Sequence, residues 1–360
     1  MKKYLIILPL LFLINFLTQT FSQEIFNNEL TGIPNWYNAQ LPPGPKPNKN
    51  TTLSLIMVKG NKFINAEGDT ILFRGLAFAD PDKIEADGRW KKEIFQSLKD
   101  LGANLVRIPI HPIAWRNRTP DKYLKLLDQA VNWSTELGLY VIIDWHSIGN
   151  LKAGLFQDPY YITSLTETLN FWRTIAQHFS GNNTVAFYEL FNEPTLYNGQ
   201  LGRMTWSEWR EINEEMIELI RAFDKETIPL VAGLDWAYDL TPLNYDPVNA
   251  EGIGYVSHPY PHKRTPPYEP KWDEAFGFAA ARYPVFATEF GFTLGDLSMK
   301  DNYEYGKAII RFLEDRGISW AWWIYDPHWY PQMIKSWDNP TLTDNGQFFK
   351  DAADGIVGDK

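Results

Sequence analysis

The sequence predicts an α/β fold, a (β/α)₈ TIM barrel that begins at residue 53 and runs to residue 360. Eight apolar segments, too short for helices, alternate with stretches that have helical periodicity. Apolar strands separated by amphipathic helices are typical of a parallel sheet covered by helices, and eight such units close most simply into a barrel. Polar residues also gather where the apolar segments end, which is the end of a barrel that carries functional sites.

Residues 1–22, at the start of the chain, are typical of a secretion signal. Two N-terminal lysines precede an apolar stretch from Tyr4 to Leu17, and Thr20-Phe21-Ser22 offers small residues for cleavage. The apolar stretch is shorter than the roughly 20 residues that span a bilayer as a helix. We therefore expect no membrane span, a mature chain that begins near Gln23, and a secreted or periplasmic protein.

Residues 23–52 form a leader that is rich in proline. The run LPPGPKPNKN at 41–50 favours an extended, semi-rigid chain. The leader has few apolar anchors beyond Phe26, Trp36 and Tyr37. We expect it to lie on the surface of the domain and to contribute little to stability.

The composition excludes several kinds of function. The chain has 360 residues, a net charge of −10 and a pI near 5.2. This charge argues against nucleic acid or an anionic membrane as a partner, because both demand a basic surface. The absence of cysteine removes disulfides, thiolate catalysis and cysteine-bound zinc. A neutral substrate suits this acidic surface better, and a monomeric protein is expected. The 15 tryptophans exceed what core packing needs and indicate ring faces kept for stacking.

The barrel is preceded by a predicted hairpin with turns at Lys59-Gly60-Asn61 and Glu67-Gly68-Asp69. Strands are then predicted at 70–76, 103–110, 139–146, 185–194, 229–236, 253–260, 284–292 and 318–325. Helices are predicted at 89–101, 120–137, 163–179, 205–223, 271–282 and 302–316, several of them followed by glycine. The fifth unit is the weak one, because residues 237–252 show turn residues and no helical pattern.

The predicted strands end in side chains that can carry chemistry, whereas the strand starts offer nothing comparable. These residues are Arg107, His111, Asp144, Trp145, His146, Asn192, Glu193, Asp235, Trp236, His258, Tyr260, Glu289, Trp322 and Trp323. They occupy seven of the eight strand ends. Packing alone does not explain such a gathering on one face of a barrel.

Glu193 and Glu289 are the strongest catalytic candidates. Each follows an apolar run, VAFYELFNEP at 185–194 and PVFATEFGF at 284–292, and an unpaired buried carboxylate is costly and usually has a raised pKa. On the fourth and seventh strands the two would face each other across the barrel mouth. Two facing carboxylates are the minimum for glycoside hydrolysis: one protonates the leaving oxygen, and the other attacks the anomeric carbon or activates water. The alternative for Glu193 is a salt bridge at a strand end.

Four further residues each have a chemical use and a structural alternative. Arg107 is placed to hold a carboxylate ionised, unless it forms a plain salt bridge elsewhere. His146 and His258 can donate to substrate hydroxyls or to a catalytic carboxylate, or they are satisfied core histidines. Tyr260 can donate to a nucleophilic carboxylate or to a backbone group.

Aromatic residues near the end of the chain are candidates for sugar stacking. Trp322 and Trp323 cannot both point inward on a regular strand, so one is a candidate platform and the other packs in the barrel wall. The loop at 258–270, stiffened by prolines, and an aromatic loop after the eighth strand are expected to wall the cleft. The aromatic residues of the second loop are Trp329, Tyr330 and Trp337.

The chain resembles glycoside hydrolase family 5, the cellulase-type family of the clan of barrel hydrolases whose catalytic glutamates lie on strands four and seven. The likeness covers roughly residues 60–350 and is carried by NLVRIPI, VIIDWH, LFNEP, SHPY, FATEFG and ISWAWW. Asn-Glu-Pro alone is a moderately specific motif. Its placement together with Arg on strand two, His on three, His-x-Tyr on six, Glu on seven and Trp on eight is strongly specific.

The resemblance implies a role for each matching residue. Glu193 would be the acid/base and Glu289 the nucleophile of a retaining enzyme. Asn192 would contact the sugar 2-hydroxyl, and Arg107 and Tyr260 would contact the nucleophile. His146 and His258 would bind the substrate or tune the carboxylates. Trp323 would form a platform under the attacked sugar. Trp323 is chosen over Trp322 because ISWAWW matches the usual strand end of the family best in that register.

The sequence therefore predicts a secreted, retaining endo-β-glycanase that cuts internal β-1,4 bonds of a plant or algal polysaccharide, with no cofactor. A β-glucan is the expected substrate, which makes the enzyme an endo-β-1,4-glucanase. A β-1,4-mannanase or a β-1,3-glucan-active enzyme of the same family stays open. The residues that sense the sugar lie in loops at 77–90, 111–120, 147–162 and 261–270, whose shapes cannot be derived.

Two hypotheses lie outside this family. One is a metal-dependent barrel hydrolase with His111, Asp144, His146 and His258 as ligands, although no His-x-His follows the first strand. The other is a non-catalytic barrel that binds glycans, which would require one of the two carboxylates to be missing. Because both carboxylates are present, catalysis is favoured.

Overall fold

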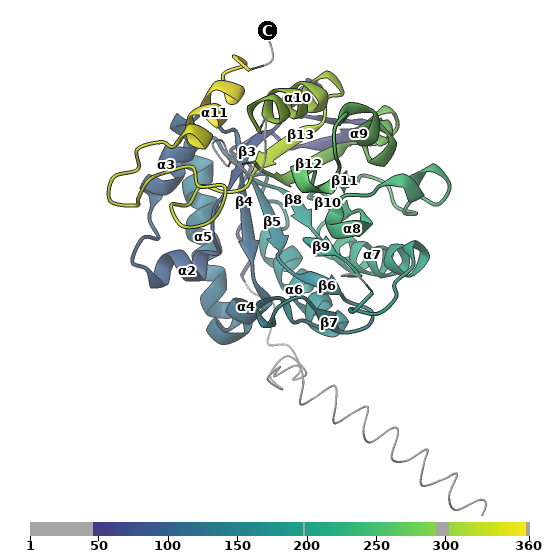
Figure 1. Cartoon of the computed structure of the whole chain (residues 1–360). Coiled ribbons are helices and arrows are strands. Elements are labelled where there is room, and N and C mark those ends of the chain that lie inside the picture. The colour runs from purple at the N-terminus through teal and green to yellow at the C-terminus, as the bar shows by residue number, and fades with distance from the viewer. Residues whose placement is uncertain (1–45, 197–198, 293–301, 358–360) are drawn as a thin grey trace, which may run out of the picture. The chain divides into compact units, whose positions relative to one another are not determined.

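A closed barrel of eight parallel strands forms the centre of the fold, as the sequence predicts (Figure 1). The computed structural model describes residues 46–196, 199–292 and 302–357. The predicted signal at 1–22 and the leader up to residue 45 lie outside the described residues. The strands follow one another around the barrel in chain order: β3 (Arg74–Ala77), β4 (Leu105–Ile110), β5 (Tyr140–Trp145), β8 (Val185–Glu189), β10 (Ile228–Ala232), β11 (Gly254–Val256), β12 (Val285–Phe290) and β13 (Ser319–Trp322).

Helices surround these strands (Figure 1). They are α2 (Pro81–Ala86), α3 (Lys92–Asp100), α4 (Pro112–Arg118), α5 (Pro120–Leu137), α6 (Leu165–Phe179), α7 (Trp206–Arg221), α8 (Leu234–Ala237), α9 (Glu269–Ala275), α10 (Asn302–Asp315) and α11 (Asp344–Ala353). Short 3₁₀ turns lie at η2 (Pro159–Tyr161), η3 (Thr241–Asn244), η4 (Pro261–Lys263) and η5 (Gly277–Ala281). The helices α2, α4, α8 and α11 are not predicted by the sequence. Both α2 and α4 are short and begin with proline, so they resemble loops in the sequence.

Local sequence signals set the ends of the longer helices. Helix α5 begins at Pro120, whose fixed φ suits the first turn, and stops at Gly138, whose φ of 67° is left-handed. Helix α7 begins with a capping box, in which the side chains of Thr205 and Glu208 each bond the backbone N–H of the other. Buried apolar residues on one side of each helix then pack on the barrel.

Several predicted boundaries are wrong. The first barrel strand starts at Arg74 and not at residue 70, because Thr70 pairs instead with Ile64 of the hairpin. The predicted strand 229–236 ends at Ala232, since residues 235–237 have positive φ angles of 56–58° and turn the chain. The predicted helix 271–282 is divided into α9 and η5. Between residues 237 and 252 the only helical turn is η3, as the turn residues predict.

The predicted strand 185–194 is the most informative error. Barrel strand β8 ends at Glu189. The N–H of Leu190 still donates to the carbonyl of Leu230 on β10 at 3.1 Å, and Phe191 packs on Trp209 at a ring-centroid distance of 5.4 Å. Glu193 and Pro194 form a separate strand, β9 (Glu193–Pro194), in a small sheet with β6 (Ile148–Asn150) and β7 (Leu155–Phe156). Glu193 is therefore held by a sheet outside the barrel ladder.

Aromatic side chains close the amino end of the barrel. The hairpin of β1 (Met57–Lys59) and β2 (Lys62–Ile64) places Phe63 against Phe187, with ring centroids 5.0 Å apart. Phe73 lies 5.1 Å from Phe187 and 6.2 Å from Phe286. We call these four residues the aromatic plug. Each ring contributes on the order of 2–3 kcal/mol through burial.

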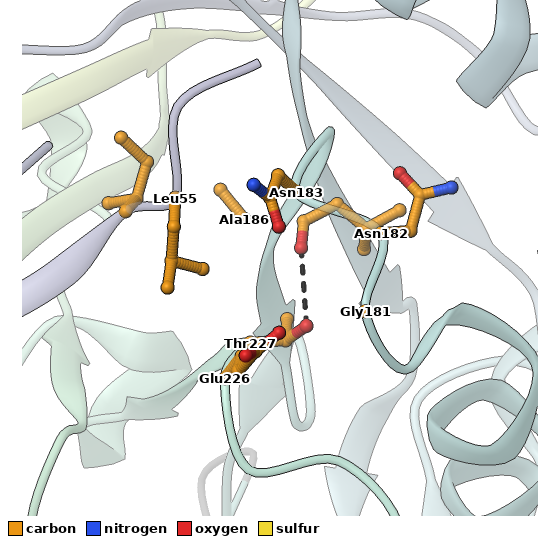
Figure 2. A pocket seen from close by; sticks show the side chains of 9 residues that line it. Leu55, Gly181, Asn182, Asn183, Ala186, Glu226 and Thr227 are labelled. Carbon is orange, nitrogen blue, oxygen red and sulfur yellow. Dashed lines mark hydrogen bonds between the residues drawn. The ribbon is translucent and has the colours of Figure 1, made fainter. Parts of the chain in front are cut away.

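The amino end leaves little space for a ligand. A cavity beside the starts of β8 and β10, lined by Leu55, Asn182, Thr227 and their neighbours, has a volume of about 10 Å³ (Figure 2). A single water needs about 10–15 Å³ on this measure. This cavity is too small for a sugar.

The last residues of the predicted leader contact the barrel. The backbone N–H of Asn48 donates to the carbonyl of His178 at 2.7 Å, and the Nδ2 of Asn182 donates to the carbonyl of Asn48 at 2.7 Å. Asn50 forms a parallel bridge with Asn182. In the described part of the chain, no helix is both long and apolar enough to cross a membrane.

Candidate active site

A buried arginine joins the polar side chains at the carboxyl end of the barrel. Arg107 on β4 is fully buried, and its Nε and Nη2 donate to the two oxygens of Glu189 at 2.8 and 3.0 Å. Its Nη1 donates to Glu289 Oε2 at 2.9 Å. Its Nη2 also contacts Asn192 Oδ1 at 2.6 Å and Asp144 Oδ2 at 2.9 Å. The guanidinium thus supplies the positive charge that lets several carboxyl groups lie in one dry region.

Glu289, on β12, is held through both of its oxygens. Arg107 binds Oε2, and the hydroxyl of Tyr260 donates to Oε1 at 2.7 Å. Burial raises the pKa of Glu289, and the positive charges of His258 and Arg107 oppose that shift without cancelling it. Because Arg107 and Tyr260 each donate to a different oxygen, the carboxyl group is fixed in orientation, and it is only 6% exposed. These properties suit a nucleophile.

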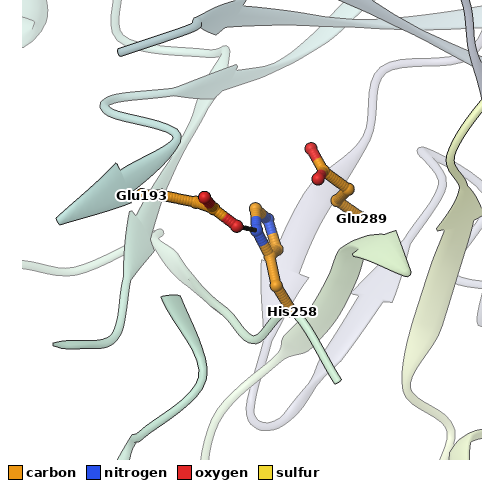
Figure 3. A group of neighbouring side chains, drawn as sticks. All are labelled: Glu193, His258 and Glu289. Carbon is orange, nitrogen blue, oxygen red and sulfur yellow. Dashed lines mark hydrogen bonds and ion pairs between the residues drawn. The ribbon is translucent and has the colours of Figure 1, made fainter. Parts of the chain in front are cut away.

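Glu193, on β9, contacts the imidazole of His258 (Figure 3). His258 Nδ1 lies 3.1 Å from Glu193 Oε1, and its Nε2 lies 3.1 Å from the hydroxyl oxygen of Thr288. Because the Thr288 hydroxyl donates its own proton to Glu189 at 2.9 Å, it accepts from His258. Both ring nitrogens then donate, which requires an imidazolium. Burial opposes this charge, but the bonds to Glu189 and Glu193 raise the pKa of His258 to about 9.

The two glutamates lie close enough to act on one bond. An oxygen of Glu193, an oxygen of Glu289 and a ring nitrogen of His258 all lie within 4.8 Å of one another (Figure 3). Retaining glycosidases separate their carboxyl groups by about 5–5.5 Å, whereas inverting enzymes need about 6.5–9.5 Å to admit water. The spacing fits retention.

The same three residues are the only group of potential metal ligands that converges within the described ranges. Their chemistry does not suit a metal, because both nitrogens of His258 are protonated and an arginine already binds Glu289. The ligand set of the metal hypothesis does not converge. Asp144 binds Arg107 and His146.

His146 and Trp323 form a second part of the site. Their rings stack at a centroid distance of 5.3 Å and an angle of 4°. His146 Nδ1 lies 2.7 Å from Asp144 Oδ2, and burial, together with the positive charges of nearby groups, lowers the pKa of His146 well below its usual value. The neutral ring donates to Asp144 and keeps its Nε2 lone pair for a ligand hydroxyl. Trp322 packs instead on Phe292 in the barrel wall, at a centroid distance of 4.7 Å.

Asn192 presents a buried donor. Its side-chain oxygen accepts from Arg107, and its Nδ2 has no hydrogen-bond partner among the residues that the structure describes. A buried amide nitrogen without a partner costs free energy unless a ligand satisfies it. The structure thus brings all eight predicted site residues to one end of the barrel, and Asp235 and Trp236 lie at the same end, on the turn after β10.

The sequence did not single out Glu189 or Thr288, and Asp144 was assigned a role only in the metal hypothesis. Glu189 links Arg107 to Thr288, and Arg107 lowers the pKa of Glu189 to about 2 although burial alone would raise it. A lone Glu inside the apolar run VAFYELF was a usable signal. Thr288 offered none, because threonine is common in strands.

A large cavity adjoins His146 and Trp323. It has a volume of about 840 Å³ and is lined by the loops that follow β3, β4, β5 and β13. That volume lies within the 300–1,000 Å³ range of ordinary ligand sites. This cavity is far larger than the one beside the starts of β8 and β10.

Comparison with known proteins decides the family. A family model described as cellulase (glycosyl hydrolase family 5) matches residues 64–329. The chain belongs to this family. The resemblance seen in the sequence is therefore confirmed.

Solved structures and curated relatives agree with this assignment. A native β-glucanase from Saccharophagus degradans, SdGluc5_26A, is 43% identical with a TM-score of 0.84, covering 90% of this chain and all of that one. A structure of the same β-glucanase in complex with cellotetraose is 42% identical with the same TM-score and coverage. Endoglucanase E-5 of Thermobifida fusca is 26% identical over 79% of this chain. The match covers 59% of the length of that relative.

Proposed function

We propose that this chain is an endo-β-1,4-glucanase that cleaves a β-glucan by double displacement, with Glu289 as nucleophile and Glu193 as acid/base. The observation that carries the proposal is the pair of nearly buried carboxyl groups within 4.8 Å, one held by Arg107 and Tyr260 and the other by His258. The names of the relatives support the substrate. They include endoglucanases and a β-glucanase solved with cellotetraose.

In the first step, Glu289 attacks the anomeric carbon while Glu193 gives its proton to the leaving oxygen. The glycosidic bond breaks, and an ester bond forms between the sugar and Glu289. His258 stabilises the carboxylate that proton transfer leaves on Glu193. In the second step, water attacks the anomeric carbon, Glu193 takes a proton from that water, and the ester bond to Glu289 breaks.

The other residues position the sugar. Trp323 provides an apolar ring face for the attacked sugar, and His146 Nε2 accepts from a sugar hydroxyl. Asn192 Nδ2 donates to the 2-hydroxyl. These contacts fit the neutral His146 ring and the buried, unpartnered amide nitrogen.

Proton nuclear magnetic resonance of the first-formed reducing ends tests the mechanism. We expect the β-anomer to appear first from a β-linked substrate and to mutarotate later. Initial α-anomer would contradict a nucleophilic Glu289. Chelators should leave the rate unchanged, because no step uses a metal.

A panel of soluble polysaccharides with product sizing tests the substrate. We expect a β-1,4-linked glucan to be cut internally, so that chain length falls faster than new reducing ends accumulate. Preferred cleavage of mannan or of a β-1,3-glucan would contradict the proposal. We also propose that the enzyme acts outside the cytoplasm, which the signal-like sequence at 1–22 supports.

A further inference from the structure

We propose that Trp329 and Lys83 form a distal platform that binds glycone sugars of the substrate, beyond the sugar that Glu289 attacks. This inference rests on the proposed glucanase function and adds a binding site to it. The 840 Å³ cavity has His146 and Trp323 in its wall, and it also has Lys83 and Trp329. One continuous space therefore connects the attacked sugar with this second tryptophan.

The position of Glu193 decides which part of the substrate enters this cavity. Glu193 protonates the leaving oxygen, so the leaving sugars lie on its side, where it contacts His258. The cavity lies over the loops after β3, β4, β5 and β13, and neither catalytic glutamate lines it. Sugars that continue past Trp323 into the cavity are therefore the ones that stay attached to the enzyme after the first step.

The platform has a fixed framework. The buried carboxylate of Asp326 accepts from the backbone N–H groups of His328 and Trp329, at 2.6 and 3.0 Å, and so fixes the loop. The Lys83 ammonium lies over the Trp329 ring, 4.8 Å from its centroid, which orients the indole. Trp329 remains 45% exposed although it is anchored. An oriented, exposed indole in the wall of a carbohydrate cleft is suited to stacking on the apolar face of a sugar.

The chain supplies a matched control beside the platform. Tyr330 is the next residue and is 69% exposed, but it does not line the cavity. Removal of its ring changes the exposed aromatic surface of the same loop without changing the proposed platform.

The experiment measures kcat/KM for aryl β-cello-oligosaccharides with one to four glucose units in the glycone. In the wild type we expect kcat/KM to rise with chain length, because binding energy of remote sugars is used in the transition state. In Trp329→Ala the increase in kcat/KM that one distal sugar gives should be roughly tenfold smaller, because the contact between that sugar and one face of the indole is lost. Turnover of the shortest substrate should be unchanged, and Tyr330→Ala should match the wild type throughout.

A second variant tests the role of the lysine. Lys83→Met keeps the aliphatic side chain and removes the charge over the indole. We expect a loss of about threefold at the same sugar as in Trp329→Ala, because exposed cation–π contacts are weak. Equal losses for Trp329→Ala on the shortest and longest substrates would overturn the proposal, since they would show a structural role.

The outcomes separate this inference from the proposed function. A wild type that turns over no cello-oligosaccharide but cuts another glycan refutes the glucanase function. A wild type whose kcat/KM rises with chain length, with every increment retained in Trp329→Ala, refutes the platform alone.

Discussion

The two ends of the barrel use the same strands for opposite purposes. At the amino end, the rings of the aromatic plug pack together, and the cavity beside the starts of β8 and β10 has a volume of only about 10 Å³. At the carboxyl end, Arg107 binds three carboxyl groups, and a cavity of about 840 Å³ adjoins His146 and Trp323. Stability is concentrated at the first end and chemistry at the second, as in other barrels of this fold.

The change from one end to the other takes two residues along a strand. On β8, Phe187 belongs to the aromatic plug and Glu189 binds Arg107. On β12, Phe286 belongs to the plug and Thr288 contacts His258. Side chains of alternate residues point to the same face of a strand, so both pairs point into the barrel. Along each of these strands, the inward-facing residue near the amino end is apolar, and the next inward-facing residue, two positions later, is polar.

The largest expected effect is at the carboxyl end. Glu289→Gln should lower turnover by roughly 10⁴-fold or more, because the covalent step loses its nucleophile. The melting temperature should stay equal or rise, because burial disfavours the ionised carboxylate of Glu289 and the amide carries no charge to bury. Steady-state rates and thermal melts of the same preparation check both parts. A large fall in melting temperature would show that this end also carries the stability.

Phe63→Ala in the aromatic plug should have the opposite effect, a loss of stability without a loss of activity. Truncation of this buried ring should cost about 3–5 kcal/mol in the free energy of unfolding. The value of kcat, measured well below the melting temperature, should be unchanged. Urea unfolding and kinetics at the same temperature test this separation, with Tyr245→Ala, 77% exposed, as the neutral control. Reduced kcat in folded Phe63→Ala would break the comparison.

The next prediction is that the stability of the fold depends on pH through His258, at the carboxyl end of the barrel. The pKa of His258 is about 9 in the folded protein, compared with about 6.5 for a histidine in the unfolded chain. The charge of His258 therefore stabilises the folded state fully below pH 6.5. As the pH rises from 6.5 through 9, on the order of 3 kcal/mol should be lost. Urea unfolding at several pH values measures this loss. In His258→Gln this part of the pH dependence should disappear, and an identical slope in both proteins would contradict a charged His258.

The smallest expected effect lies at the amino end. A chain that starts at residue 53 lacks the bonds that Asn48 makes with His178 and Asn182. It should be less stable than a chain that starts at residue 46 by about 1–3 kcal/mol, because the nearly buried Asn182 loses partners. Both chains should have the same kcat. Equal melting temperatures would show that residues 46–52 contribute nothing, as the proline content of the leader alone predicts.

Much of the fold follows from the sequence because its signals are local. Apolar runs predict the strands, and the glycine after α5 predicts where that helix stops. The hairpin is likewise predicted by its turns. The short helices α2 and α4 could not be predicted in this way. Their packing against the barrel outweighs a weak local pattern.

The site shows where a regular pattern misleads. Thr288 and Glu289 are neighbours, yet both reach the polar centre, because β12 shifts its register with β13 between Ala287 and Phe290. Such an irregularity re-aims a side chain, and a strict alternation cannot predict it. The alternation of side chains along β8 does not apply to Glu193, because Glu193 belongs to β9, outside the barrel ladder. Alternation did correctly separate Trp322 from Trp323.

The most direct test of the account is rescue of two glutamate variants by azide on an activated aryl β-glycoside, with the configuration of each product determined. Glu193→Ala can still form the glycosyl-enzyme, because the leaving group scarcely needs protonation. Azide then replaces water without a general base and should give a β-azide. Glu289→Ala lacks the covalent step, so azide entering its vacant position should attack from the opposite face and give an α-azide. Exchanged configurations would reverse the two roles, and hydrolysis unimpaired in both variants would contradict the site itself.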